Sequence, residues 1–160
     1  MKQLKVQFRR VMITISKEVE FDTGHRVTTH GSKCKNPHGH RYKLKVTCVG
    51  KIIQDENRPD FGMLVDFGDL KSLMTERIHD VFDHAMVVWE KDHSLLKAME
   101  VDPEWKVVVF PLIPTAENMA RWIWGQLQDP IRDLFQDDLE LYRVDLWETP
   151  TSVASYCSSN

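Results

Sequence analysis

Residues 38–50 read HGHRYKLKVTCVG, and this stretch indicates the fold because apolar and polar side chains alternate along it. A period of two is typical of a β-strand that buries one face, so a strand is predicted over residues 40–50. Its buried face carries Tyr42, Leu44, Val46 and Cys48, and its open face carries Arg41, Lys43, Lys45 and Thr47.

A second strand is predicted over residues 12–22, where the same alternation recurs with one interruption at Lys17. Its apolar side consists of Ile13, Ile15, Val19 and Phe21. The loop between the two strands, with the polar segment after Gly50, completes a hairpin-like unit.

Two amphipathic helices are predicted after this unit. Asp66 is a suitable N-cap for the first, which carries apolar residues at a spacing of three to four: Phe67, Leu70, Leu73, Met74, Ile78 and Val81. The second begins at Pro114-Thr115, with Thr115 as the cap, and Pro130 is expected to end it. Its apolar stripe consists of Met119, Trp122, Ile123 and Leu127.

The C-terminal part returns to strands. Residues 139–148 alternate, with Tyr142, Val144, Leu146 and Glu148 on one side and Leu141, Arg143, Asp145 and Trp147 on the other. A short last strand is predicted over residues 153–157, whereas residues 105–110 fit either a strand or an extended loop. The order predicts an α+β fold: a four-stranded antiparallel sheet with two helices on one face. The open edges of such a sheet favour assembly by edge pairing.

The composition is that of one globular domain. The chain has 160 residues with 21 basic and 24 acidic side chains, a net charge of −3 that argues against a nucleic-acid partner. Apolar runs are too short to span a membrane, so no membrane partner is expected. Three sparse cysteines favour a reducing compartment, and we expect the cytoplasm. Residues 1–11 are interpreted as a basic N-terminal extension, and residues 12–160 as the single domain.

Three histidines form the candidate metal site. His38 and His40 are two residues apart in a strand, so their side chains point to the same side. His25 continues the apolar parity of residues 12–22, and strand pairing would bring all three imidazoles together. Three neutral imidazoles with an open fourth position are typical of a catalytic zinc site, although other divalent ions would also bind. The alternative is that the His-x-His pair is an ordinary surface feature.

Cys34 and the Asp83-His84 pair are candidates for proton transfer. Cys34 lies between two lysines in a polar loop, a setting that favours a thiolate, or it is an ordinary loop thiol. Asp83 could orient His84 and raise its basicity. Alternatively, His84 lies at a helix end against the helix dipole.

Glu148 is predicted at the end of a strand on the apolar side, where a carboxylate needs a partner. It could form an inward ion pair, or it could bind the guanidine-like edge of a ligand through two hydrogen bonds. The remaining histidines, His30, His79 and His93, are interpreted as surface residues.

Six motifs in this order resemble the 6-pyruvoyl-tetrahydropterin synthase / 6-carboxytetrahydropterin synthase family, and together they span residues 12 to 157. They are Phe21-Asp22-Thr23-Gly24-His25, Cys34-x-x-x-His38-Gly39-His40, Gly62 to Lys71, Phe82-Asp83-His84, Pro114 to Asn118, and Trp147-Glu148-Thr149. The resemblance implies the tunnelling fold. In that fold three four-stranded sheets join edge to edge into a barrel, and two trimers stack as a homohexamer.

The resemblance also implies roles for individual residues, with 7,8-dihydroneopterin triphosphate as substrate. Zinc would be the cofactor, bound by His25, His38 and His40. Cys34 would be the general base, Asp83 and His84 a proton relay from an adjacent subunit, and Glu148 the anchor of the pterin edge, which also joins the relay in some members. Thr115 and Glu117 match a motif near the pterin pocket, where helix capping is the alternative role.

The spacing around Cys34 distinguishes the branches of this family. Three residues separate Cys34 from His38, as in the 6-carboxy branch, which serves queuosine and other 7-deazaguanines. The resemblance therefore implies a lyase that forms 6-carboxy-5,6,7,8-tetrahydropterin, acetaldehyde and triphosphate. The alternatives are 6-pyruvoyl-tetrahydropterin synthase, a noncatalytic zinc-containing pterin-binding oligomer, and an unrelated three-histidine zinc hydrolase. The chain departs from the family at Phe82, at Trp147 and in the long segment 86–113.

Overall fold

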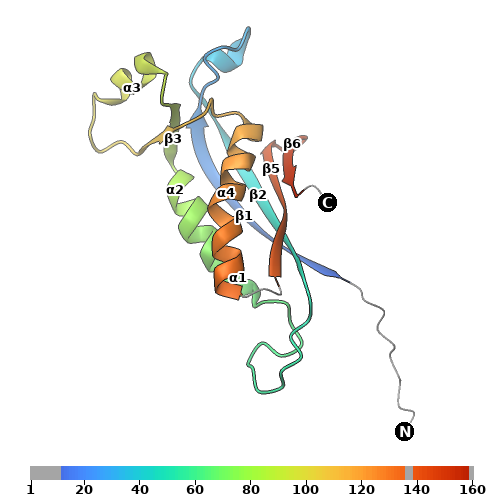
Figure 1. The fold of residues 1–160 in the computed structure, drawn as a ribbon. Helices are drawn as coiled ribbons and strands as arrows, with labels where there is room; N and C mark the ends of the chain where they lie inside the picture. Colours follow the sequence, from blue (N-terminus) through green and yellow to red (C-terminus); the bar gives the residue numbers. More distant parts are fainter. Residues whose placement is uncertain (1–11, 136–138, 159–160) are drawn as a thin grey trace.

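The computed structural model describes residues 12–135 and 139–158, so the predicted extension 1–11 lies outside the described residues. Helices cover one face of a single curved sheet (Figure 1). The strands are β1 (Ile13–His25), β2 (His38–Gly50), β3 (Ala85–Trp89), β4 (Val107–Phe110), β5 (Leu139–Thr149) and β6 (Ser152–Cys157). The helices are α1 (Phe67–Met74), α2 (Asp80–Phe82), α3 (His93–Met99) and α4 (Ala116–Phe135), with a short 3-10 helix η1 (Lys33–Lys35) and a short π-helix η2 (Thr75–His79).

The sheet has six strands in the order β4-β3-β1-β2-β5-β6, and it is mixed. The pairs β1–β2, β2–β5 and β5–β6 are antiparallel, as the sequence predicts. The prediction of four antiparallel strands alone is wrong, because β3 runs parallel to β1 and β4 runs parallel to β3. These two strands come from the long segment 86–113 and cover the edge of β1 that the predicted sheet left open.

Two details of the predicted elements are also wrong. The second helix does not end at Pro130 but continues to Phe135. Its buried stripe runs on from Leu127 to Ile131, and burying that side chain offsets the hydrogen bond that proline cannot donate. In β5, Cys48 pairs with Leu141 and Thr47 with Arg143, which leaves the intervening Tyr142 as a bulge. The bulge turns Leu141 into the core and leaves Tyr142 exposed, the reverse of the predicted alternation.

The core lies between the sheet and the helices η2, α1, α2 and α4. An aromatic group at its centre fixes the end of α2: the Phe82 ring lies 5.7 Å from Phe21 and 5.3 Å from Trp122 between ring centroids. The buried Phe82 ring therefore fixes the position of the backbone directly before Asp83. The residues that are fully buried include Phe21, Tyr42, Leu44, Leu70, Ile78, Phe82, Met119, Ile123 and Leu127.

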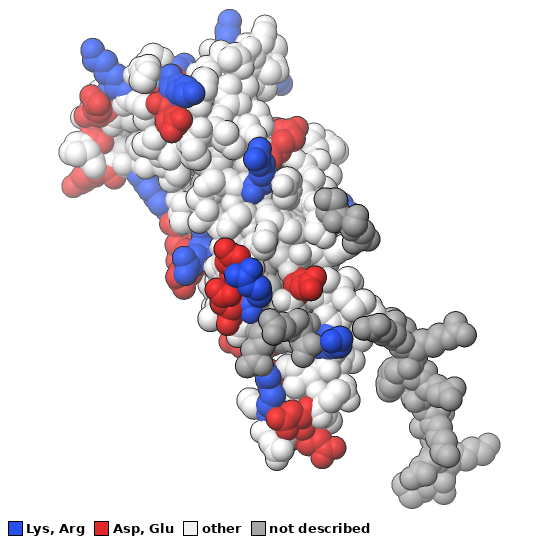
Figure 2. Space-filling view, viewed as in Figure 1, with Lys and Arg blue, Asp and Glu red and all other residues white. Residues whose placement is uncertain are grey.

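Acidic and basic side chains are interspersed over the helix-bearing face, and the described residues do not gather into a patch of one sign there (Figure 2). That surface agrees with the small net charge of the chain. Among the described helices, none has the length and apolarity needed to cross a membrane.

Candidate active site

The three predicted metal ligands come together at one end of the β1–β2 ladder. His25 pairs with His38, and Thr23 pairs with His40, so all three imidazoles lie on the helix-covered side of the sheet. The ring centroid of His25 lies 4.6 Å from that of His38 and 5.5 Å from that of His40, and the latter two are 5.0 Å apart. One ligand atom from each residue lies within 4.8 Å of the others. This spacing suits a single metal ion.

Backbone carbonyls fix which ring nitrogen of these histidines is free. Nδ1 of His25 lies 2.6 Å from the carbonyl oxygen of Pro114, and Nδ1 of His38 lies 2.8 Å from that of Asn36. A carbonyl only accepts, so both Nδ1 atoms donate and both Nε2 atoms keep their lone pairs for a metal. Burial lowers the pKa of His25 and of His40, which keeps these rings neutral. The donor set therefore fits a divalent ion such as zinc.

Two glycines lie in the strand ends beside the cluster. Gly24 and Gly39 lie opposite each other in the ladder. A Cβ atom at position 39 would lie 3.3 Å from the carbonyl oxygen of Thr23, and one at position 24 would lie 2.8 Å from Cε of Met86. Gly39 thus permits a close backbone approach beside the histidines, whereas the atom met at position 24 is the end of a flexible side chain.

Glu148 reaches the same cluster from the end of β5. Its Oε1 lies 3.5 Å from Nε2 of His25, and it accepts a hydrogen bond of 3.2 Å from the hydroxyl of Tyr42. Burial raises the pKa of Tyr42, which keeps the hydroxyl protonated as a donor. The partners of this carboxylate are therefore a phenol and the histidine cluster, and its other oxygen can accept from a ligand.

Cys34 lies in the loop between β1 and β2 and lines a hollow of about 230 Å³ with His25 and His38 of the cluster. The backbone N–H of Val27 donates to the Cys34 carbonyl over 2.8 Å, which ties the loop back toward β1. The hollow is lined by His25, Val27, His30, Cys34, His38, Thr115, Ala116, Glu117, Glu148, Ser152, Val153 and Ala154. The structure thus brings the predicted cysteine, two predicted metal ligands and the predicted pterin anchor to one hollow.

Two further predicted residues, Thr115 and Glu117, line the same hollow at the start of α4. The Thr115 hydroxyl also accepts a hydrogen bond from the backbone N–H of Asn118 over 3.4 Å, so it caps the helix as well. His30 is exposed, as the sequence predicts, but it lines the hollow too. Its place four residues before Cys34 in one loop is the signal that could have identified it.

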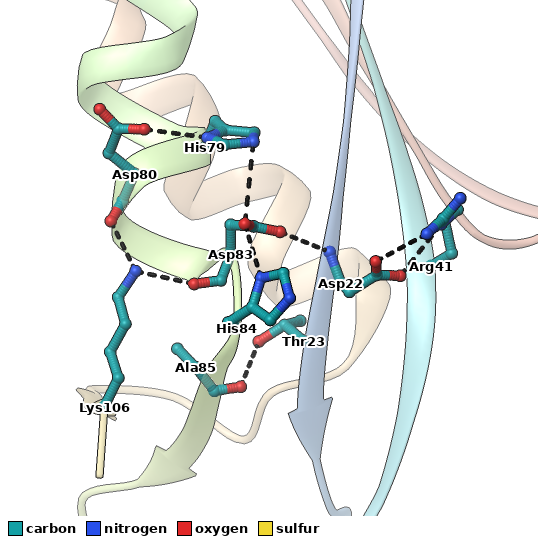
Figure 3. Close-up of polar contacts among 9 residues, drawn as sticks. All are labelled: Asp22, Thr23, Arg41, His79, Asp80, Asp83, His84, Ala85 and Lys106. Carbon is teal, nitrogen blue, oxygen red and sulfur yellow. Dashed lines mark hydrogen bonds and ion pairs between the residues drawn. The ribbon is translucent and has the colours of Figure 1, made fainter. Parts of the chain in front are cut away.

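The predicted pair Asp83 and His84 does interact. Nδ1 of His84 lies 2.7 Å from Oδ2 of Asp83, and Oδ1 accepts from the backbone N–H of Asp22 over 3.0 Å (Figure 3). The hydrogen bond from Asp22, followed by that from His84, lowers the pKa of the Asp83 carboxyl. A charged carboxylate thereby orients an imidazole whose side chain is 79% exposed.

Within one chain, the pair does not share the hollow of Cys34. His84 lines a separate, shallow hollow with Asp22, Thr23, Gly24, Gly39, His40, Arg41 and Ala85. The two hollows have no lining residue in common. The chain therefore presents Cys34 with His25 and His38 in one hollow, and His84 with the third histidine of the cluster, His40, in another.

A family model described as 6-pyruvoyl tetrahydropterin synthase matches residues 14–159. The chain belongs to this family. A relative from Haemophilus influenzae, named 6-carboxy-5,6,7,8-tetrahydropterin synthase, is 35% identical over 147 residues, which cover 91% of this chain and 99% of the relative. The human 6-pyruvoyl tetrahydrobiopterin synthase is 30% identical over 162 residues, covering 92% and 93% of the two chains. The resemblance read from the six motifs is confirmed.

A solved structure of a family member supports the fold. The 6-pyruvoyl tetrahydropterin synthase of Caenorhabditis elegans superposes with a TM-score of 0.64 at 25% identity, covering 96% of this chain and all of that one. The segment 86–113, singled out as a departure from the family, contains most of β3 and all of α3 and β4. Trp147, another departure, lies under the ammonium of Lys43, with Nζ 4.2 Å from the ring centroid.

Proposed function

We propose that the chain is a lyase that converts 7,8-dihydroneopterin triphosphate to 6-carboxy-5,6,7,8-tetrahydropterin, acetaldehyde and triphosphate, in 7-deazaguanine (queuosine) biosynthesis in the cytoplasm. One observation supports this above all: Cys34 lines one hollow with His25, His38 and Glu148. The three-residue spacing between Cys34 and His38 and the name of the Haemophilus influenzae relative favour the 6-carboxy product.

We propose that His25, His38 and His40 hold zinc. His25 and His38 bind it through Nε2, and His40 binds it through one of its two ring nitrogens. When bound, the ion supplies Lewis acidity to the hydroxyl groups of the substrate side chain. The carbonyls of Pro114 and Asn36 orient two of the ligands and keep the correct nitrogen unprotonated.

The residues around the cluster supply binding and proton transfer. Cys34 acts as the general base that removes a proton from the substrate side chain. Glu148 binds the 2-amino and N3 edge of the pterin with its two carboxylate oxygens, one of which is held by the Tyr42 hydroxyl. Thr115 and Glu117 lie where they can contact the ring.

We further propose that Asp83 and His84 act in the site of a neighbouring subunit. Nδ1 of His84 is engaged by Asp83, so Nε2 faces outward from an exposed side chain and can exchange a proton with a group on another chain. The outer strands β4 and β6 provide edges for pairing into a barrel of three subunits, two of which stack as a homohexamer.

Product analysis tests the proposed activity. The full chain loaded with zinc is incubated with 7,8-dihydroneopterin triphosphate, and the products are identified by mass spectrometry. We expect 6-carboxytetrahydropterin and acetaldehyde, both lost after chelation and in Cys34→Ala, and both retained in Cys157→Ala, whose cysteine is exposed on β6. A 6-pyruvoyl product, as the name of the human relative suggests, would overturn the 6-carboxy assignment and keep the site. Hydrolysis of simple esters without turnover of the pterin would overturn the family chemistry.

A further inference from the structure

The backbone at His84 has an unusual conformation for its residue type. Its φ is 56°, in the left-handed region. Among the residues that the structure describes, it is the only non-glycine residue with a positive φ. Such a conformation persists only where the surrounding contacts determine it. The contacts that hold this turn therefore decide where the His84 imidazole points.

The peptide group between Asp83 and His84 is held from two opposite sides. On one side, the N–H of His84 donates to the carbonyl oxygen of Asp22 over 2.7 Å. On the other, the Asp83 carbonyl accepts a hydrogen bond of 2.8 Å from Nζ of Lys106 (Figure 3). Since this peptide plane sets φ of His84, both contacts act directly on the strained angle.

Lys106 also ties this peptide to the helix before it. Its Nζ donates to the carbonyl of Asp80 over 2.7 Å, so one ammonium bridges the carbonyl of the first residue of α2 and that of Asp83, which follows the helix. Such carbonyls lack helical partners, and a cation there also interacts favourably with the helix dipole. The lysine thereby occupies the position that a helix cap would take.

The backbone of Lys106 is itself fixed next to the pair. Its carbonyl accepts from the N–H of Met86 over 2.9 Å, and β4 begins one residue later, paired with β3. Lys106 comes from the segment 86–113, which departs from the family pattern. The segment begins directly after the turn at Asp83–Ala85, and the Lys106 side chain contacts that same turn.

We propose that Lys106 is a positioning residue for the Asp83–His84 pair, which it orients by holding the peptide plane between them. The inference rests on the proposed function for the role of the pair, but the contact itself is independent of any activity. Lys106 touches neither the histidine cluster nor the hollow of Cys34, so removing its ammonium leaves metal binding unchanged.

Kinetics of Lys106→Met test the positioning role, because methionine keeps most of the stem and removes the donors. We expect kcat to fall about tenfold, since small misplacements of a reacting group are costly, with KM and zinc content unchanged. Lys106→Arg, which keeps a cation with several donors, is expected to recover most of the loss. Lys97→Met, at an exposed position on α3 of the same segment, is the matched control and is expected to behave as wild type.

Hydrogen exchange provides a readout that needs no turnover. In Lys106→Met we expect faster exchange in peptides that cover residues 20–24 and 82–86, with unchanged exchange in those that cover β2. Unchanged exchange in the first two peptides would overturn the contact, and faster exchange with wild-type kcat would overturn the positioning role. A wild-type protein without turnover would overturn the proposed function, and the exchange comparison would still confirm or overturn the contact.

Discussion

The metal cluster and the Asp83–His84 pair are held in place by different kinds of structure. The cluster lies at the end of the β1–β2 hairpin, where thirteen residues of each strand pair without interruption from Ile13–Gly50 to His25–His38. The pair lies at the start of the edge region, residues 83–110, where β3 pairs with only three residues of β1 and β4 with four of β3.

This difference predicts how each region responds to substitution. A long ladder places its side chains by parity, so changing one residue of the hairpin removes a ligand without moving its neighbours. The edge region depends on separate polar contacts, such as Lys106 on the Asp83 carbonyl and the Thr23 hydroxyl on the Ala85 carbonyl. A single substitution can remove one of these contacts, and we expect it to shift Asp83 and His84 without displacing the three histidines.

The largest effect is expected from removing a ligand of the hairpin. His38→Ala leaves two imidazoles, so we expect zinc to be lost. We expect turnover to fall by at least about 10³-fold, which exceeds the loss typical of removing a residue that only hydrogen-bonds to a metal ligand. Metal analysis of the purified protein and a turnover assay measure both. His93→Ala, at an exposed position on α3, is the control; equal zinc content in the two variants would contradict the assigned ligands.

Cys34→Ala separates chemistry from metal binding within the same hollow. Removing the general base is expected to lower turnover by about 10²–10⁴-fold, because that is the usual contribution of such a group. Zinc content is expected to stay at the wild-type level, since Cys34 is not one of the three ligands. Retained turnover in Cys34→Ala would remove the cysteine from the mechanism.

Asp92→Asn tests the edge region through stability. Two guanidinium hydrogen bonds from Arg26 end on the buried Asp92 carboxylate, which also caps α3 at Leu95. Hydrogen bonding to Arg26 lowers the pKa of this carboxyl below its ordinary value of 3.8. We expect a loss of about 2 kcal/mol in the free energy of unfolding at pH 7, as for hydrogen bonds to a charged group.

The sign of the Asp92 effect fixes its pH dependence. A carboxyl with a lowered pKa stabilises the folded chain above its ordinary pKa, and this contribution is lost as the pH falls toward the lowered value. Urea unfolding of wild type and Asp92→Asn should therefore converge below about pH 4. Asp129→Asn, from an exposed pair with Arg132, is the control, with an expected loss below about 1 kcal/mol. A difference that grows with acidity would contradict the ion pair.

The smallest effect is expected from Tyr42→Phe. The variant removes the hydroxyl between His25 and Glu148 but keeps the ring that stacks on Phe21, with 5.5 Å between centroids. We expect turnover to fall about fivefold, the equivalent of one hydrogen bond, with zinc content unchanged. A large loss of zinc would show that the hairpin does not place its ligands independently of this contact.

The sequence was sufficient for the hairpin and insufficient for the edge region. The apolar alternation of residues 40–50 and the parity of His25 depend on local pattern, and both were predicted. In contrast, the apolar run at residues 105–110 fits strand or loop equally, and no strand was predicted over residues 85–89. The pairing of β3 with β1 and of β4 with β3 is a long-range choice. The bulge at Tyr142 and the passage of α4 through Pro130 were missed because tertiary packing overrides local preference there.

The candidate site divides in the same way. Cys34 and the three histidines lie within sixteen positions of one another, so one hairpin brings them together. The interaction of Asp83 with His84 was foreseen as one of two alternatives, since the residues are adjacent. The contacts of that pair with Asp22 and Lys106 join residues far apart in the sequence, and no spacing signals them.

Subunit mixing tests the central claim, that the hairpin of one subunit and the Asp–His pair of another complete each site. Cys34→Ala and His84→Ala, each inactive alone, are co-expressed with different tags, and mixed oligomers are isolated. In a random mixture about one quarter of the sites would combine an intact Cys34 with an intact His84 from a neighbour, and we expect that fraction of wild-type turnover. Mixed oligomers without activity, beside an active wild type, would show that both groups act within one chain and would contradict the account.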